Sequence, residues 1–269
     1  MDHHLQEFYR QSSDEAPRGN FHTVIALHQH SEISWQKIQE EMPCLCRGWY
    51  ELAHLNSKDR IEFLRDFWLA KLPYRNGLNE SINHFFSSLD DIGIFLTQKK
   101  FEDPFQAHLV YSIQNNGGFF RGASPASDQI LSNLQKAFSD YILPNDYFAF
   151  LQIHNGFCKA TDCTGIISAE KVPDSYSVLQ KLIQGSDLMM LSNRKTVDPK
   201  TLIPFYESFG MPFYQCFWTE WYPEQEMGNV YYSAEAKTIS DVFSGASNTE
   251  IMAFSTFTDW LMFYLERIE

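Results

Sequence analysis

Histidine and cysteine are the residues of this chain whose chemistry is easiest to recognise, because both bind metals and both serve in catalysis. His154 is followed closely by Cys158 and Cys163, which gives three possible zinc ligands. A structural zinc site needs four ligands and usually contains a CxxC pair, whereas Cys44 and Cys46 form only a CxC pair. We therefore predict no metal site, and we expect reduced, small buried thiols instead.

Three more histidines, His22, His28 and His30, lie close together near the N-terminus. No cysteine or carboxylate follows them at a spacing typical of a metal site, so we interpret them as scattered surface residues. The sequence has no G-x-S-x-G motif, no glycine-rich phosphate loop and no H-E-x-x-H motif. We therefore predict no catalytic residue and no cofactor.

Two further features invite a catalytic interpretation. His154 lies at the end of an expected helix, where the helix dipole favours a protonated imidazole, but its spacing from Tyr147 and Phe150 indicates a packed residue. The pair Asp90–Asp91 is interpreted as a solvated corner. The alternative is an enzyme with an active site between the two halves of the chain, and a deep pocket containing His154 or His108 would favour it.

His154 belongs to a stretch, residues 127–156, that predicts two helices. In the first, Ile130, Leu131 and Leu134 begin an apolar stripe at helical spacing, and the helix is expected to end at residue 143 because a proline follows. Pro144 suits the first turn of a second helix. Asn155 and Gly156 then supply a residue pair that commonly stops a helix.

The remainder of this half alternates strands and helices. We predict strands at 165–169, 202–206, 213–218 and 229–233, a helix at 175–183 and a further apolar strand at 188–193. The chain ends in an amphipathic helix that begins near Phe257, with Thr256 and Asp259 placed as a capping box.

The first half predicts helices and a small antiparallel sheet. After a flexible lead-in at residues 1–20, helical spacing occurs at 33–42, 57–72 and 78–89. The helix at 57–72 has two apolar stripes, so we expect it to be buried between two layers. Strands are expected at 92–97, 107–113 and 119–121. We predict an α+β protein with an antiparallel or mixed sheet flanked by helices, an N-terminal region at 21–122 and a second domain at 126–269.

The second half resembles a known family. The motif combines Leu143, Pro144, an acidic residue at Asp146, Tyr147, Phe150, Leu151, His154, Asn155 and Gly156. The aromatic strands LIPFYESFG, FYQCFW and GNVYY, which include Pro204, and the closing helix with Trp260 follow in the same order. Together they resemble the SUKH superfamily of Smi/Knr cell-wall-assembly regulators and bacterial toxin-immunity proteins. This resemblance implies a non-catalytic binding fold, and it makes the motif residues structural.

The distribution of charged residues along the chain indicates which classes of partner are favoured. Residues 1–125 hold 12 basic and 16 acidic residues, whereas residues 126–269 hold 9 and 18. Such an acidic half repels nucleic acid and anionic membranes and favours a basic protein partner, although it also serves solubility. No apolar run is long enough for a membrane helix, and the N-terminus has no secretory signal, so we expect a cytoplasmic protein.

The aromatic strands carry the predicted binding surface. Eleven aromatic residues lie between Phe205 and Tyr232, interleaved with carboxylates. Aromatic rings give contact area and carboxylates speed the encounter with a basic partner. We predict that the partner-binding residues are Trp218, Glu220, Trp221, Tyr222, Glu224 and Glu226, although the rings could equally cover the sheet edge. The resemblance implies that the partner is a protein, with a basic toxin domain as the candidate, and a scaffold or regulatory role stays open.

Overall fold

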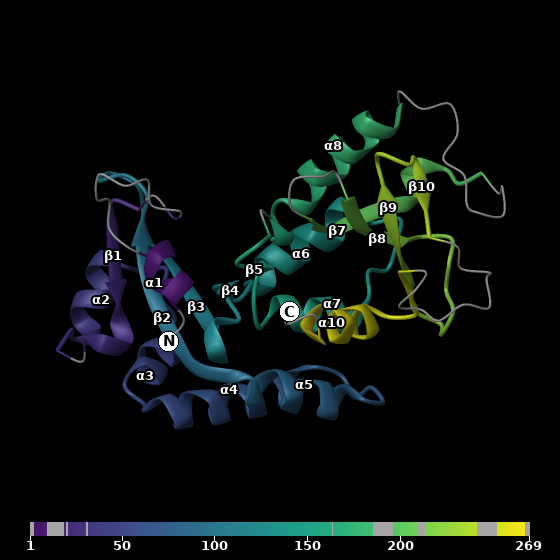
Figure 1. Ribbon diagram of the computed structural model, residues 1–269. Helices are drawn as coiled ribbons and strands as arrows, with labels where there is room; N and C mark the ends of the chain where they lie inside the picture. The colour runs from purple at the N-terminus through teal and green to yellow at the C-terminus, as the bar shows by residue number, and fades with distance from the viewer. Residues whose placement is uncertain are drawn as a thin grey trace. The chain divides into compact units, whose positions relative to one another are not determined.

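A computed structural model gives the fold (Figure 1). It describes residues 3–9, 19, 21–30, 32–162, 164–184, 196–208, 213–240 and 252–266. The chain divides into two compact units: unit 1 contains Met1–Lys71 and Asn79–Pro125, and unit 2 contains Leu72–Leu78 and Ala126–Arg267. Each unit combines helices with antiparallel strands. The predicted α+β class is therefore confirmed.

Unit 1 contains four antiparallel strands that lie side by side. Its strands are β1 (Thr23–Ala26), β2 (Leu89–Gln98), β3 (Gln106–Ile113) and β4 (Phe119–Ala123), in that order across the sheet. The predicted hairpin and the third strand are present, and β2 begins three residues earlier than its apolar run. Between β3 and β4, Asn115, Asn116 and Gly118 all have positive φ, which matches the tight turn expected from an Asn-Asn-Gly-Gly sequence.

Three of the four longer helices of unit 1 lie where the sequence predicts helices. The four are α2 (Trp35–Glu41), α3 (Arg47–Ala53), α4 (Ser57–Lys71) and α5 (Leu78–Ser87), and α3 was not predicted. Helix α4 buries Leu64 and Trp68. Its second stripe faces outward, since Phe63 is 55% exposed and stacks on Phe67 at a centroid distance of 6.5 Å. The expectation that α4 lies between two layers is therefore wrong.

The N-terminus forms part of the core of unit 1. Helix α1 (His3–Phe8) is followed by Tyr9, whose ring stacks on Phe95 at 4.1 Å. Leu5 and Tyr9 belong to a buried cluster with Phe95, Val110 and Phe119. The predicted flexible lead-in is thus wrong for residues 3–9, because these apolar side chains gain burial against the sheet. Residues 10–18 lie outside the described part of the chain.

The strands of unit 2 are antiparallel as well. The strands β5 (Phe157–Lys159), β6 (Gly165–Ile166), β7 (Leu202–Glu207), β8 (Phe213–Trp218), β9 (Asn229–Ser233) and β10 (Thr238–Ile239) are neighbours in that order. Strand β11 (Ala253–Phe254) also pairs with β9. The three predicted aromatic strands are confirmed, whereas β6 is shorter than expected. The predicted strand at 188–193 lies outside the described residues.

Helices cover both faces of this sheet. They are α6 (Asp128–Ala137), α7 (Asn145–Leu151), α8 (Val172–Gln184) and α10 (Phe257–Glu266). Leu179 and Ile183 of α8 are buried with Cys216 and Trp218 of β8. On the opposite face, the ring of Phe217 lies 5.1 Å from that of Tyr147 in α7. Because the sheet is sandwiched, its aromatic strands are buried on both sides, and Figure 1 shows α8 and the α7–α10 pair on either side of β7 and β8.

Helix α6 ends earlier than predicted. Ser127 caps its start, with Oγ accepting a hydrogen bond from the N–H of Ile130 at 3.3 Å. The helix stops at Ala137 rather than at residue 143. In a continued helix Phe138 and Ile142 would share one face, yet Phe138 is buried and Ile142 is 81% exposed. The early end thus buries Phe138 and leaves a non-helical link to α7.

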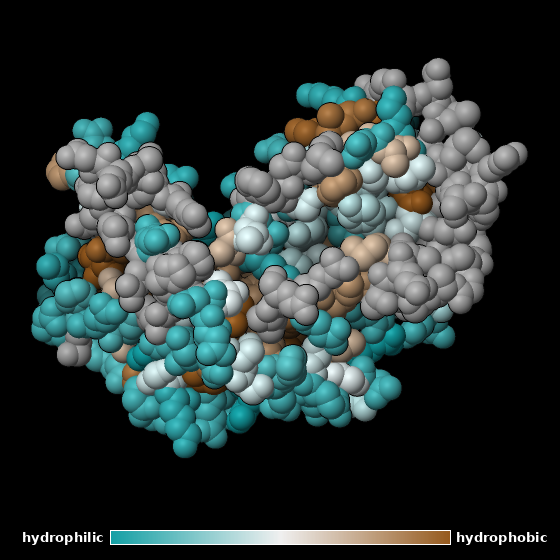
Figure 2. All heavy atoms as spheres, viewed as in Figure 1, coloured by the Kyte–Doolittle hydropathy of each residue, from teal (hydrophilic) through white to brown (hydrophobic). Residues whose placement is uncertain are grey.

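The outer face of α8 is apolar as well. Val178 and Leu182 are both exposed and are separated by one helical turn. Figure 2 shows hydrophobic side chains gathered over this helix. The predicted helix at 175–183 is confirmed, with three further residues at its start and one at its end.

Candidate functional site

The loop at residues 219–228 joins β8 to β9 and carries five of the six predicted partner-binding residues. Its base is closed by backbone hydrogen bonds from Trp218 N–H to Gly228 O at 3.0 Å and from Gly228 N–H to Trp221 O at 2.9 Å. A Cβ at Gly228 would lie 2.4 Å from the Trp221 ring. The Trp221 ring therefore packs directly on the glycine, and the loop has a defined shape.

The sixth predicted residue, Trp218, is a correction. Its side chain is only 1% exposed and belongs to the cluster beneath α8, so it cannot present a ring to a partner. Trp218 lies at the end of its strand, where we expected a large ring to stay exposed, and alternation by itself buries only one side of a strand. The alternation is present, but α8 covers one face and α7 with α10 covers the other.

The five loop residues are more accessible. Tyr222 is 47% exposed, Glu220 and Glu224 are exposed, and Trp221 and Glu226 are partly buried. The loop thus places an exposed aromatic ring among three carboxylates. Whether these residues contact a partner stays a prediction.

An arginine that the sequence did not single out lies beside this loop. Arg75 of the segment 72–78 donates two hydrogen bonds to Asp259, from Nε to Oδ1 at 2.8 Å and from Nη2 to Oδ2 at 2.6 Å. It also donates two to Glu224, from Nη2 to Oε1 at 3.0 Å and from Nη1 to Oε2. No sequence signal marks this role, since Arg75 is distant in sequence from both carboxylates.

Two carboxylates of the loop have pKa values shifted in opposite directions. The hydrogen bonds that Arg75 donates lower the pKa of Glu224, and the same bonds to Glu224 and Asp259 raise the pKa of Arg75. Glu226 behaves in the opposite way, because burial and then the charges of Asp146 and Glu224 raise its pKa, with Arg75 opposing them. Within the described part of the chain, neither Glu220 nor Glu226 forms an ion pair.

The motif residues lie at the centre of unit 2. Leu143, Pro144, Tyr147, Phe150, Pro204 and Trp260 are buried. Pro144 is the residue that precedes α7, rather than part of its first turn. Gly156 has φ +108°, which requires the conformational freedom of glycine. Asn155 connects the segment after α7 to residues 169–170, because its Oδ1 accepts from Ala169 N–H and its Nδ2 donates to Glu170, both at 2.7 Å.

The two histidines that would favour an enzyme, His108 and His154, are buried in aromatic surroundings. His154 is buried and stacks on Phe157 at 5.4 Å. His108 is buried too, with its Nδ1 3.3 Å from the Tyr9 hydroxyl, and burial lowers its pKa to about 3. Among the described residues no three metal-binding side chains gather at one place, and Cys163 lies outside them.

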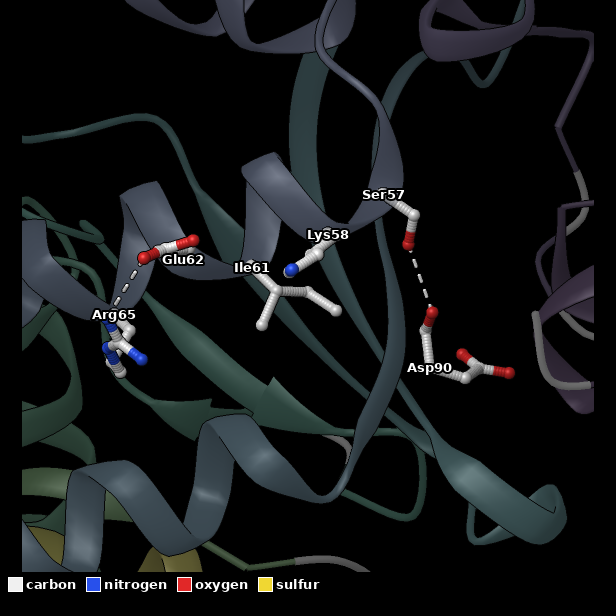
Figure 3. A pocket seen from close by; sticks show the side chains of 6 residues that line it. All are labelled: Ser57, Lys58, Ile61, Glu62, Arg65 and Asp90. Carbon is white, nitrogen blue, oxygen red and sulfur yellow. Dashed lines mark hydrogen bonds and ion pairs between the residues drawn. The ribbon is translucent and has the colours of Figure 1, made fainter.

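A concave surface of about 570 Å³ occurs in unit 1, at the start of α4 (Figure 3). It is lined by Ser57, Lys58, Ile61, Glu62, Arg65 and Asp90, and it contains neither His108 nor His154. Its charges are mixed, and Arg65 already pairs with Asp66 at 2.8 Å. The pocket therefore does not resemble the titratable cluster that the enzyme alternative requires.

The acidic pair next to this pocket also differs from expectation. Asp90 and Asp91 lie in strand β2 rather than at a turn. Asp91 pairs with the buried Arg60, whose Nη2 donates to Oδ1 at 2.6 Å. The interpretation of both residues as a solvated corner is thus wrong for Asp91, because burial of Arg60 demands a nearby carboxylate.

No helix in the described ranges has the length and apolarity needed to cross a bilayer.

Comparison with known proteins agrees with the motif. A model of the SMI1 / KNR4 family (SUKH-1) matches residues 125–262, which is more than half of the 269 residues. The match includes α6, α7, α8 and the strands β5 to β9, and all motif residues from Leu143 to Trp260 lie within it. A search of curated proteins found no relative that matches this chain. The chain belongs to the SMI1/KNR4 family (SUKH-1).

Proposed function

We propose that this protein is a non-catalytic binding module that recognises a basic protein partner through the loop 219–228. The proposal is consistent with the family, which includes immunity proteins and regulators. An immunity role, in which the loop sequesters a toxin domain by direct contact, and a role as a regulatory scaffold use the same surface. The proposal includes a cytoplasmic location, where the thiols would stay reduced.

The observation that carries the proposal is the exposed Tyr222 ring between Glu220 and Glu224 on a loop of defined shape. A tyrosine gives a large contact area at a low cost in side-chain entropy. The carboxylates provide charge complementarity to lysine and arginine, which raises the association rate more than the final affinity. A preorganised loop also avoids the entropy cost of ordering on binding.

Affinity capture with matched variants tests the proposal. The tagged full-length protein is used to capture partners from a lysate of its source organism. The test variant is Tyr222→Ala/Glu220→Lys, and the control is Phe101→Ala/Glu102→Lys, which removes one exposed aromatic ring and reverses one exposed charge in unit 1. One stoichiometric basic protein should bind the wild type and the control but not the test variant. Equal capture by both variants would contradict the proposed surface.

An enzyme remains the competing hypothesis from the sequence. Both histidines that would favour it are buried among aromatic side chains. Because general acid–base catalysis requires a titratable group within hydrogen-bond reach of a substrate, these positions give it no support.

A further inference from the structure

We infer that Arg75 is the positioning residue of the proposed binding loop: it fastens loop 219–228 to the first turn of α10 and leaves Glu220 and Glu226 to face the partner. The part that concerns the partner rests on the proposed function. The fastening itself is a property of the free protein.

The first argument is the geometry of the guanidinium group. Arg75 makes four N–H···O hydrogen bonds, two to Glu224 in the loop and two to Asp259 in α10. Bidentate pairing of this kind fixes the orientation of the carboxylate as well as its distance from the guanidinium, and it is stronger than a contact between point charges. A lysine at this position keeps the positive charge but cannot form both bidentate pairs.

The second argument is that Asp259 lies on a rigid support. Its backbone N–H donates to Thr256 Oγ1 at 3.1 Å, which caps α10. The neighbouring Thr258 N–H donates to the buried Asp146 carboxylate at 2.8 Å. These two hydrogen bonds fix the first turn of α10. Because Arg75 binds both Asp259 in this turn and the exposed Glu224, it restricts the position of Glu224 as well.

The third argument is electrostatic. The charges of Asp146 and Glu224 raise the pKa of Glu226, and Arg75 opposes that rise. The charge of Asp259 likewise raises the pKa of Asp146. In the described part of the chain, Arg75 is the single cation paired with Glu224 or Asp259. If Arg75 is removed, the carboxylates of the loop and of α10 repel each other, and the loop should lift away from the helix.

Since Glu224 is occupied by Arg75, the three acidic residues of the loop have different roles. Glu224 holds the loop, whereas Glu220 and Glu226 form no ion pair with a cation in the described ranges. The sequence alone predicts the same partner-binding role for all three.

Hydrogen–deuterium exchange tests the fastening without any partner. The full chain is compared with Arg75→Ala, Arg75→Lys and the control Arg47→Ala, which removes an exposed Arg47–Glu51 ion pair in unit 1. Amides of loop 219–228 should exchange about tenfold faster in Arg75→Ala, to an intermediate extent in Arg75→Lys and unchanged in the control. Protection of α10 reports whether each variant is folded. Unchanged loop exchange in a folded Arg75→Ala protein would overturn the inference.

Binding of a deca-lysine peptide at low salt then tests the role toward a partner, with deca-glutamate as the control peptide. Removal of Arg75 makes the surface more negative, so a purely electrostatic surface would bind deca-lysine more tightly. A positioning role predicts weaker binding despite the added negative charge. Tighter binding would overturn the partner half of the inference. If the wild type does not bind deca-lysine, the basic-partner proposal fails, and the exchange result still decides whether Arg75 fastens the loop.

Discussion

The Asp146 carboxylate caps helix α10 from helix α7. Its Oδ2 accepts hydrogen bonds from the backbone N–H of Thr258 at 2.8 Å and from the Thr258 hydroxyl at 2.9 Å. Oδ1 accepts from the N–H of Tyr147 at 2.9 Å. The acidic residue of the Leu143-Pro144 motif therefore has a structural role, because it satisfies N–H groups that the start of a helix leaves without partners.

Replacement of Asp146 should destabilise unit 2. Asp146→Ala leaves the buried N–H and hydroxyl of Thr258 without an acceptor, so we expect a loss of about 1–3 kcal/mol in unfolding free energy. Asp174→Ala, at an exposed carboxylate in the first turn of α8, is the control and should cost less than about 1 kcal/mol. Urea denaturation measures both. Equal losses would show that the Asp146 contacts add nothing beyond a helix-dipole effect.

Trp218 and Tyr222 should respond differently to truncation. Trp218→Ala opens a cavity beneath α8 and should cost about 3–5 kcal/mol of stability. Tyr222→Ala removes an exposed ring and should change stability by less than about 0.5 kcal/mol. Thermal and urea unfolding distinguish the two. If Trp218→Ala were neutral for stability, its burial in the core would be refuted.

Gly228 and Gly48 form a second matched pair. In Gly228→Ala the new Cβ would lie 2.4 Å from the Trp221 ring, so the ring must move, at an expected cost of about 1–3 kcal/mol. Gly48 lies in helix α3 and, apart from its chain neighbours and the backbone of its own helix, no atom lies within 4 Å of its Cβ position. Gly48→Ala should therefore stabilise the protein by about 0.5–1 kcal/mol. Tryptophan fluorescence and urea denaturation report ring displacement and stability, and a stabilising Gly228→Ala would contradict the packing of Trp221.

His108 should make stability fall as the pH falls. Burial, and then the positive charges of Arg121 and Lys99, lower its pKa to about 3 in the folded protein, against 6.5 in the unfolded chain. Between these values the unfolded chain binds a proton that the folded protein does not, so acid favours unfolding. The slope should approach about 1.4 kcal/mol per pH unit. The unfolding midpoint of His108→Gln should depend less on pH over this window, and an equal dependence would refute the assignment.

Carboxylate titration by NMR tests the electrostatic roles in the loop. Arg75 lowers the pKa of Glu224, so Arg75→Ala should raise that pKa toward its ordinary value. Arg75 also opposes the upward shift at Glu226, so the pKa of Glu226 should rise further in the same variant. The wild-type Arg75–Glu224 contact is present above the ordinary pKa of a glutamate and is lost as the pH falls through the lowered value. An unchanged Glu224 titration would show that the pair does not form in solution.

The sequence determined the elements whose signals are local. The alternating aromatic residues of β7, β8 and β9 and the capping residues Thr256 and Asp259 of α10 lie within a few positions of one another, so the sequence was sufficient to predict them. The motif around Asp146 likewise indicated the family.

Tertiary structure decided which surfaces remain exposed and which charges meet. Trp218 is buried because α8 covers a face of the sheet that alternation alone left open. Phe63 is exposed because α4 packs on one layer, and α6 ends early because Phe138 is buried and Ile142 is not. Arg75 reaches Glu224 and Asp259 across 149 and 184 positions. Periodicity records only what neighbours in the chain share, whereas burial of a second face and long-range ion pairs depend on elements that come together only in the folded protein.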